Sequence, residues 1–363
     1  MRKIFKFVGY LLGLFLLYVA GMLVFGTFTD WKPVGTEEIA AFGNPAPVQE
    51  VPDSVISLVS WNLGYGGIGD RDFFFYNQKG GFWWTKPGTV RMSKERVIDN
   101  IGGQGAELRR MAADIVLLQE VDTAARRSYY TNQFAVMRSA HPGYAAYFAP
   151  NFKSKRVPIP LLQPWDHYGY VISGLVSLSR ATPRTSERIQ LPGEFPWPTK
   201  LFQLDRCALR QVFAVADGRE LAVYNLHLSA YDKGGGIRQQ QMQAIRSAAL
   251  ADFKAGRYVV VGGDWNQLPP GFNWFSLNPT VERIPPPKVV AHDFMPPGWA
   301  YAYDPATATV RESDRPYDPH STRRAVIDFF LVSPNLRIAS VKGVEQAFAY
   351  SDHQPVRVQL FFE

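Results

Sequence analysis

The chain has 363 residues, of which 46% are hydrophobic and 20% charged; this composition is typical of a globular protein with a sizeable core and excludes disorder throughout. Its formal net charge of +7 at pH 7 favours an anionic partner, such as nucleic acid, phospholipid head groups or a phosphorylated small molecule, without choosing among them. The single cysteine, Cys207, excludes an internal disulfide and a thiolate zinc site. We expect it to be a small buried apolar residue.

The amino-terminal segment is strongly apolar. Residues 7–25 carry no charge, and at 1.5 Å per residue they match the ~30 Å hydrocarbon core of a bilayer. We predict a transmembrane signal anchor over residues 7–28. A basic segment, residues 1–6, precedes it and is expected to stay cytoplasmic, which places the rest of the chain outside the membrane, in the periplasm or cell exterior; its cations are Arg2, Lys3 and Lys6.

A cleaved signal peptide is the alternative interpretation of this segment. The apolar region of a signal peptide usually has about 7–15 residues and ends in small residues. The sequence Val24-Phe25-Gly26 is a poor cleavage site, which favours the anchor. Residues 29–53 contain four prolines and no sustained hydrophobic period; they are predicted to be a tether. Residues 54–363 show no repeat and no convincing break, and we predict that they form one catalytic domain.

Short apolar runs typical of strands recur along this domain. They lie at residues 55–61, 114–118, 171–178, 211–215, 221–226, 258–261, 326–332 and 356–362. Residues 237–253 have apolar side chains at helical spacing, and Gly256 can end that helix. Because some strands are joined by hairpin-length links and others by helices, the pattern indicates an α/β or α+β fold with a mixed sheet or two packed sheets.

Polar side chains stand at the ends of six of these apolar runs. Any one of them is more typical of a turn or a helix cap than of a functional site, but six in one domain point to a common cause. They are Asn62, Gln119 with Glu120, His227, Asp264 with Asn266, Asp328, and Asp352 with His353.

This set of side chains suits the hydrolysis of a phosphate ester. Carboxylate and amide oxygens with few histidines favour Mg²⁺, Mn²⁺ or Ca²⁺ over zinc, and such an ion can neutralise phosphoryl and leaving oxygens. His227 and His353 could exchange protons near neutral pH, with Asp328 orienting one of them.

The short motifs also resemble a known superfamily. They occur in the order seen in the endonuclease/exonuclease/phosphatase superfamily, which includes deoxyribonuclease I and the neutral sphingomyelinases: WN (61–62), QE (119–120), NLHL (225–228), GDWN (263–266), IDFFLV (327–332) and SDHQPV (351–356). The resemblance covers almost everything beyond the tether. It implies a four-layer α/β/β/α sandwich with two central mixed sheets.

The resemblance also implies residue roles. Glu120 would ligate a divalent metal, most readily Mg²⁺, with Asn62 and Asp352 close to it. Asp264 and Asn266 would face the scissile phosphate and its attacking water, or contribute to a metal site. His353, steadied by Asp328, resembles a general base or phosphate contact, and His227 a general acid or transition-state stabiliser.

The valine strand at residues 259–261 ends in a motif that departs from the family at one position. Trp265 stands where relatives often carry Phe; this conservative change is expected to place an indole in the core. Gly262 and Gly263 are predicted to form a bend that lets backbone and substrate approach closely.

Two further segments bear on the substrate. Residues 64–84 are rich in glycine and aromatic residues, and residues 151–169, predicted to be a loop, contain Lys153, Lys155 and Arg156. They are either ordinary surface loops or a cationic, aromatic rim that binds an anionic ester with an apolar part. Membrane tethering favours a phospholipid-like or small-molecule phosphodiester.

Two other functional classes stay open. An extracytosolic nuclease acting on DNA or RNA is the first alternative, although the cations form no dense stripe. A non-catalytic binding module on the same fold is the second. No protein partner is implied, and we expect a monomer.

Overall fold

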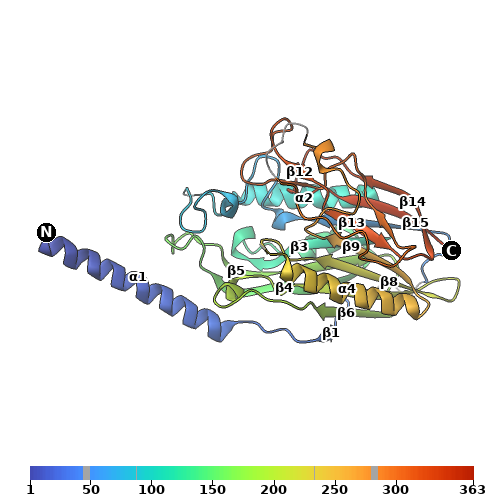
Figure 1. Cartoon of the computed structure of the whole chain (residues 1–363), viewed down its shortest axis with the longest axis horizontal. Coiled ribbons are helices and arrows are strands. Elements are labelled where there is room, and N and C mark those ends of the chain that lie inside the picture. Colours follow the sequence, from blue (N-terminus) through green and yellow to red (C-terminus); the bar gives the residue numbers. More distant parts are fainter. Residues whose placement is uncertain (44–49, 87, 233, 279–284) are drawn as a thin grey trace.

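A computed structural model describes residues 1–43, 50–86, 88–232, 234–278 and 285–363. Its first element, α1 (Arg2–Thr29), extends away from a single α/β domain (Figure 1). The helix is long and apolar enough to cross a membrane, and 6% of its most apolar window is buried. A helix over the predicted anchor is therefore confirmed. A signal sequence would meet the same criteria of length and composition, so the membrane crossing stays a prediction.

The domain is built on two mixed β-sheets. In spatial order, the seven-stranded sheet contains β1 (Thr36–Glu38), β6 (Thr185–Gln190), β7 (Cys207–Ala214), β8 (Glu220–His227), β9 (Tyr258–Asp264), β13 (Asp328–Val332) and β10 (Ala300–Ala302). The six-stranded sheet contains β14 (Leu336–Gly343), β15 (Val356–Phe362), β2 (Val55–Asn62), β3 (Ile115–Ala125), β5 (Gly169–Ser179) and β4 (Ala145–Val157). A short ribbon pairs β11 (Val310–Arg311) with β12 (Arg324–Ala325).

Helices cover the outer faces of the two sheets (Figure 1). The six-stranded sheet packs against α2 (Lys94–Met111) and α3 (Gln133–Ala140), and the seven-stranded sheet against α4 (Gly236–Lys254). Between the sheets lies a core of fully buried side chains that includes Leu58 and Val260. The four-layer α/β/β/α sandwich is confirmed. So is the burial of Cys207.

All eight strands and the helix predicted from the sequence are present, but several strands were missed. β4, β6 and β14 lie at or next to sheet edges, where one side can face water and polar residues and proline are tolerated. The assignment of Lys153, Lys155 and Arg156 to a loop was therefore wrong, because these residues lie in β4, which pairs with β5.

The segment predicted to be a tether, residues 29–53, is partly built into the domain. Strand β1 pairs with β6, and Val51 forms a bridge to Val215. An edge strand leaves backbone donors and acceptors unpaired, and β1 satisfies those of β6. A boundary at residue 54 therefore does not separate linker from domain; residues 44–49 lie outside the described part of the chain.

Two β-α-β units bring the polar residues at the strand ends close together. Strands β2 and β3, joined through α2, are parallel, and so are β8 and β9, joined through α4. Parallel neighbours end at the same edge of a sheet. Asn62 is thus level with Gln119, and His227 with Asp264.

Gly262 and Gly263 lie inside β9 and do not form the predicted bend. Gly263 has a φ of 142°, and a Cβ there would lie 2.0 Å from the Leu226 carbonyl oxygen. A Cβ on Gly262 would lie 2.5 Å from the Phe330 ring. These glycines let neighbouring strands pack closely, and neither is among the residues that line the cleft described below.

Replacing Gly263 with alanine is expected to destabilise the fold by roughly 3 kcal/mol or more, because overpacking and an unfavourable φ add together. Thermal unfolding of the full chain in detergent measures this. Gly102→Ala, in α2 with no atom within 4 Å of its Cβ, is the matched control and should be neutral or stabilising by up to about 1 kcal/mol. Equal melting temperatures for the two variants would contradict the packing argument.

Candidate active site

A cleft of about 490 Å³ opens where the parallel strands end. Six of the eight residues predicted to be catalytic or metal-binding line it: Glu120, His227, Asp264, Asn266, Asp352 and His353. The other two, Asn62 and Asp328, do not line the cleft but contact residues that do. Asn62 donates hydrogen bonds to Glu120 and Asp264, and Asp328 is hydrogen-bonded to His353. Residues that lie as far apart as 120 and 353 in the sequence thus converge on one cavity.

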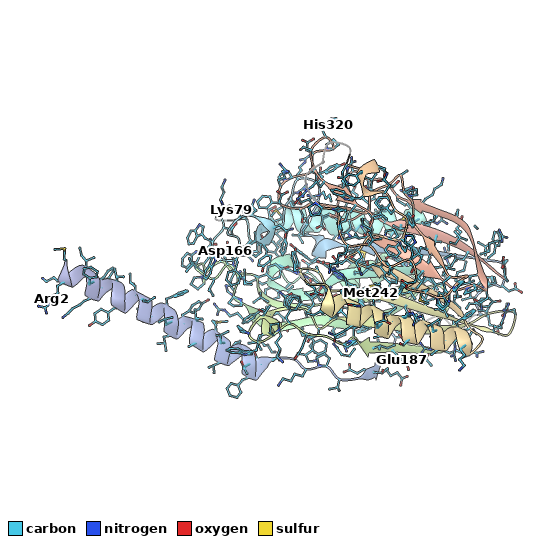
Figure 2. All side chains as sticks on the ribbon, in the orientation of Figure 1. Arg2, Lys79, Asp166, Glu187, Met242 and His320 are labelled. Carbon is cyan, nitrogen blue, oxygen red and sulfur yellow. The ribbon has the colours of Figure 1, made fainter. Side chains whose placement is uncertain are left out.

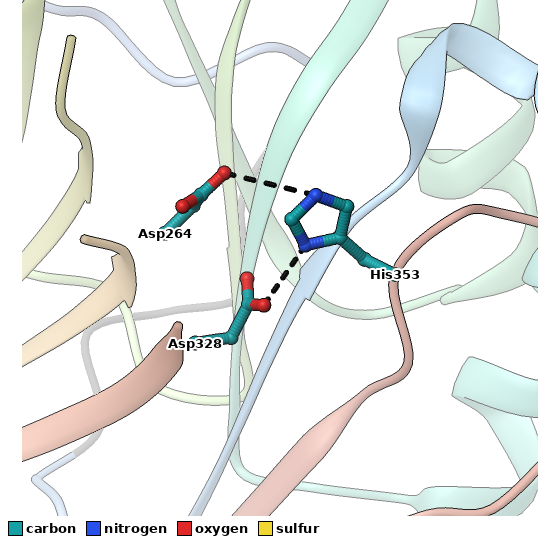
Figure 3. A group of neighbouring side chains, drawn as sticks. All are labelled: Asp264, Asp328 and His353. Atoms are coloured by element: carbon teal, nitrogen blue, oxygen red, sulfur yellow. Dashed lines mark hydrogen bonds and ion pairs between the residues drawn. The ribbon is translucent and has the colours of Figure 1, made fainter. Parts of the chain in front are cut away.

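His353 lies between two buried carboxylates (Figure 3). Its Nδ1 is 2.8 Å from Asp328 Oδ2, and its Nε2 is 3.9 Å from Asp264 Oδ2. Burial alone would lower the pKa of His353, but the charge and hydrogen bond of Asp328, together with Asp264, raise it to about 10. His353 is therefore an imidazolium that faces the cleft.

His227 approaches the same carboxylate from strand β8. Its Nε2 lies 3.3 Å from Asp264 Oδ2. Burial, reinforced by the positive charges of Arg206 and His353, holds the pKa of His227 well below its usual range. Its Nδ1 is buried without a hydrogen-bond partner among the residues that the structure describes. The two histidines thus differ in charge, His353 cationic and His227 neutral.

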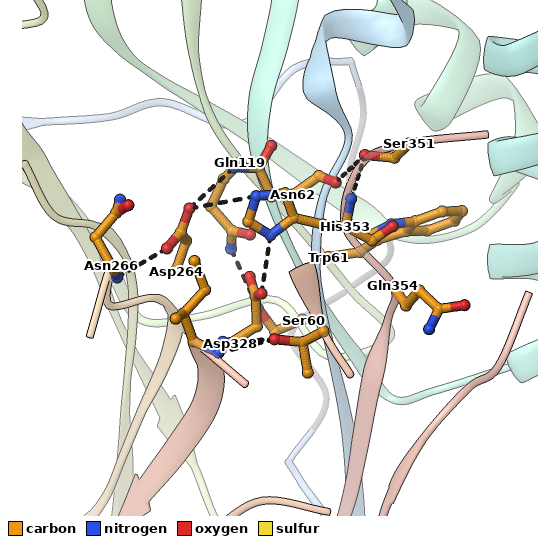
Figure 4. A network of polar contacts seen from close by, with 12 residues as sticks. Ser60, Trp61, Asn62, Gln119, Asp264, Asn266, Asp328, Ser351, His353 and Gln354 are labelled. Atoms are coloured by element: carbon orange, nitrogen blue, oxygen red, sulfur yellow. Dashed lines mark hydrogen bonds and ion pairs between the residues drawn. The ribbon is translucent and has the colours of Figure 1, made fainter. Parts of the chain in front are cut away.

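Asp264 is the centre of the polar network (Figure 4). The Asn266 backbone N–H donates to its Oδ1 at 2.9 Å, and the Asn62 side-chain amide donates to its Oδ2 at 3.1 Å. Burial and the nearby Asp328 raise the pKa of Asp264 to about 7. Asn266 adopts a left-handed conformation with φ 51°, a strain typical of functional sites.

Glu120 and Asp352 form the part of the site that best fits a metal ion. Both carboxylates face the cleft. Burial raises the pKa of Glu120, and the negative charge of Asp352 adds to this rise. Within the described ranges, neither carboxylate has a Lys, Arg or His nitrogen within 4.0 Å. Two neighbouring carboxylates without a close counter-ion, beside the Asn62 amide, suit an oxygen-preferring divalent cation such as Mg²⁺.

A second group could also contribute metal ligands. One ligand atom from each of Asp264, Asp328 and His353 lies within 4.8 Å of the others, and Asp328 Oδ1 is buried without a partner in the described structure. However, Asp328 Oδ2 already accepts the hydrogen bond of His353 Nδ1. The donor chemistry therefore fits a divalent ion best on the Glu120 side of the cleft.

Several motif residues lie beneath the cleft and stabilise the sheets that carry it. Gln119 donates to Asn225 Oδ1 at 2.8 Å, and Asn225 donates to the Leu118 and Val176 carbonyls, which ties the two sheets together. Trp265 is buried and stacks on Phe329 with ring centroids 4.9 Å apart. Its predicted place in the core is confirmed.

The sequence did not identify Arg206, a buried arginine that lines the cleft. The only side-chain hydrogen bond of Arg206 in the described structure joins Nη1 to the His227 carbonyl at 3.4 Å, and no described carboxylate lies within 4.0 Å of the guanidinium. Burial lowers the pKa of Arg206 to about 10, so it stays protonated at neutral pH. Arg127, also in the cleft wall, is instead held by Asp122 through two bonds of 2.9 and 2.7 Å.

The predicted cationic rim is not where it was expected. None of the three predicted substrate-binding cations lines the cleft: Lys153 lies over Trp31, Lys155 over Tyr170, and Arg156 donates to the Pro164 carbonyl. Other cations take that place, namely Arg206, Arg238, Lys288 and Arg311. No sequence signal marked them, because isolated Arg and Lys are ordinary surface residues. The aromatic segment does supply lining residues, among them Tyr65, Phe74, Phe75 and Tyr76.

Comparisons with known proteins agree with this architecture. No curated protein matches the chain. Solved structures with a similar fold include an endonuclease/exonuclease/phosphatase from Beutenbergia cavernae (19% identity, TM-score 0.53, 85% of this chain and 72% of that chain). They also include TDP2 from Caenorhabditis elegans (14%, 0.51, 85% and 75%) and the human nocturnin catalytic domain with a bound sulfate anion (19%, 0.50, 87% and 96%). The model of the Endonuclease/Exonuclease/phosphatase family matches residues 59–353, so the chain belongs to that family.

Proposed function

We propose that this protein is a divalent-metal-dependent phosphodiesterase, tethered to the outer face of a membrane and acting on a lipid head-group or small-molecule ester. One observation carries the proposal: a cationic His353, a neutral His227, Asp264 and two carboxylates without an ion-pair partner in the described structure, Glu120 and Asp352, line a single cleft. Members of this family hydrolyse phosphoesters, and these are the groups such a reaction needs.

The charges of the side chains in the cleft support a separate role for each of them in the reaction. Arg206 and the His353 imidazolium would bind the non-bridging phosphoryl oxygens through N–H donors. Asp264, whose pKa is raised to about 7, would accept a proton from the attacking water, positioned with help from Asn266. A divalent ion held by Glu120, Asp352 and Asn62 would supply Lewis-acid stabilisation of the phosphoryl and leaving oxygens. His227 would contact the departing oxygen.

The shape of the cleft supports an ester with an apolar part. Arg206, Lys288 and Arg311 give the cleft lining positive charge, and other lining residues, including Phe75 and Leu204, are apolar. A phosphate next to a chain or ring would contact both kinds of side chain. The cationic and aromatic lining equally suits a nucleotide strand, which keeps a second candidate open.

That second candidate is a nuclease. TDP2 from D. rerio, solved with a single-strand DNA product, shares the fold at 15% identity with a TM-score of 0.50, over 85% of this chain and 99% of that chain. In this chain, Tyr65, Tyr76, Tyr168 and Tyr231 line the cleft, and aromatic rings can stack on unpaired bases.

A substrate panel tests the two candidates. The full chain in detergent, with Mg²⁺ or Mn²⁺, is incubated with bis-p-nitrophenyl phosphate, phospholipid diesters, and single- and double-stranded DNA. We expect hydrolysis of the chromogenic diester and of a lipid diester. Cleavage of DNA alone would favour the nuclease, and no hydrolysis of any ester would contradict an enzymatic function.

Arg206→Lys is expected to lower kcat/KM for bis-p-nitrophenyl phosphate about 10- to 100-fold, because hydrogen bonds to a charged group contribute about 1.5–3 kcal/mol and lysine does not reproduce the guanidinium geometry. Initial rates over a substrate series measure the loss. Arg184→Lys is the matched control, because Arg184 is exposed and pairs with Glu220 away from the cleft. Equal kcat/KM for the two variants would remove Arg206 from the phosphate site.

A further inference from the structure

Five large apolar side chains project from two loops at one end of the domain. Phe82, Trp83, Trp84, Leu162 and Trp165, here called the aromatic surface, are all exposed, with Trp83 at 52% and Trp165 at 68%. The rings of Trp84 and Trp165 lie 6.2 Å apart, so the side chains form a cluster. Single exposed apolar residues are common, but a contiguous group marks an interaction site.

The loops that carry this surface are held rigidly. The backbone N–H groups of Leu161 and Leu162 donate to the carbonyls of Phe82 and Trp83 at 2.9 and 3.0 Å. The buried Gln163 side chain bonds both the N–H and the C=O of Thr85, at 2.8 and 3.0 Å. The backbone thus fixes the aromatic side chains outward, where they are available to a partner without a further ordering cost.

The aromatic surface adjoins both the cleft and the anchor. Phe74 to Asn77 line the cleft shortly before the first loop, and Ile159 and Tyr168 line it on either side of the second. Figure 2 shows Lys79 and Asp166, which lie in or next to these loops, at the end of the domain from which α1 extends.

The end of α1 is itself packed against the cleft wall. A Cβ on Gly26 would lie 3.4 Å from the ring of Phe202, and Phe202 lines the cleft. Trp197 Nε1 also donates to Thr27 Oγ1 at 3.2 Å. The domain is therefore not separated from α1 by a long free linker. The carboxyl-terminal end of α1, the cleft and the aromatic surface lie in one region of the molecule.

We infer that the aromatic surface docks into the same bilayer that α1 spans, so that the cleft takes its phosphoester from that membrane and its substrate is a membrane lipid. This inference rests on the membrane anchoring and phosphodiesterase activity proposed above. Tryptophan is favoured at the membrane–water interface, where its ring meets both apolar and polar surroundings. The exposed Lys79 and Lys86 flank the first loop and would face lipid phosphates.

The position of α1 favours a bilayer over a protein as the occupant of this surface. A helix that spans the membrane brings whatever packs at its outer end to the lipid head groups, and α1 packs there against the cleft wall. The apolar lining of the cleft at Phe74, Phe75 and Phe202 would then continue the route of an acyl chain out of the bilayer.

Site-directed fluorescence tests the docking directly. Cys207 is buried and is the only native cysteine, so Trp83→Cys or Trp165→Cys gives one reactive site for an environment-sensitive dye. The full chain is reconstituted into phosphatidylcholine/phosphatidylglycerol vesicles. We expect blue-shifted emission that is quenched by brominated acyl chains. His320→Cys is the matched control, since His320 is exposed and lies on another face of the domain (Figure 2), and its dye should report water.

An activity test separates docking from catalysis. The triple variant Trp83→Ser/Trp84→Ser/Trp165→Ser should lose roughly tenfold in the hydrolysis of vesicle phospholipid, because interfacial binding scales with buried apolar area, and keep its rate on soluble bis-p-nitrophenyl phosphate. Equal loss on both substrates, or dyes at 83 and 165 that report water in vesicles, would overturn the docking. A wild type inactive on both substrates would instead overturn the phosphodiesterase proposal, while the dyes still decide the docking. Blue-shifted emission that brominated acyl chains do not quench would indicate contact with protein and also overturn it.

Discussion

Replacing His353 with alanine is expected to lower kcat/KM for a phosphodiester by roughly 10²- to 10⁴-fold, the usual contribution of a positioned proton-transfer or charge-stabilising group. In the folded protein the His353 imidazolium is held by Asp328 at 2.8 Å and faces the cleft. Without it, no cation among the described residues would lie within 4.0 Å of Asp264, because His227 is neutral. Steady-state hydrolysis of bis-p-nitrophenyl phosphate by the full chain measures the change.

The variant needs a check on folding, because alanine leaves the carboxylates of Asp264 and Asp328 buried without the cation between them. His353→Gln fills the same space with an uncharged donor and should show a similar loss of activity with a smaller loss of stability. Asp328→Asn, which removes only the orienting charge, should lose less activity than His353→Ala. Exogenous imidazole should partly restore His353→Ala. If His353→Ala were folded and retained full activity, His353 would have no part in the chemistry.

Removal of divalent ions is expected to lower turnover by at least about 10³-fold, since Lewis-acid stabilisation contributes several kcal/mol and each 1.4 kcal/mol is about tenfold in rate. Treatment with EDTA followed by titration with Mg²⁺, Mn²⁺ or Ca²⁺ measures both the loss and its recovery. The reason lies in Glu120 and Asp352, two cleft carboxylates with no close positive partner in the described structure.

Direct binding locates the ion independently of activity. Glu120→Gln should weaken Mn²⁺ binding, followed by electron paramagnetic resonance or calorimetry, by about tenfold or more, because a neutral amide replaces a charged ligand. Asp99→Asn, on the exposed side of α2, is the matched control and should bind Mn²⁺ as the wild type does. Full turnover after exhaustive EDTA treatment, or unchanged binding in Glu120→Gln, would contradict the assignment of Glu120 as a ligand.

The interior of the fold could be predicted from the sequence because its signals are local. Buried strands such as β2, β9 and β13 are continuous apolar runs, and α4 has apolar residues at helical spacing. The polar residues that end these strands meet because parallel strands terminate at one sheet edge. The order of the short motifs therefore predicted both the sandwich and the residues that line its cleft.

The strands at the edges of the sheets have no such hydrophobic pattern in the sequence. Strand β1 is polar, β6 is polar except at Ile189, and β4 contains Pro150 and three cations. The pairing of these strands depends on a neighbour that the local sequence does not specify. For the same reason β1 was taken for tether, and the cations of β4 for a loop at the substrate site.

The chemistry of individual side chains depends on the three-dimensional fold. Arg206 is one arginine among many in the sequence, and the fold buries it beside His227, where no carboxylate of the described residues lies within 4.0 Å of it. His227 is neutral because burial, reinforced by the charge of Arg206, lowers its pKa, whereas His353 is cationic because it lies against Asp328. The residue types that gather at the strand ends could be read from the amino-acid sequence. Their charges depend on burial and on neighbours from distant strands, since desolvation and Coulomb interactions act through space and not along the chain.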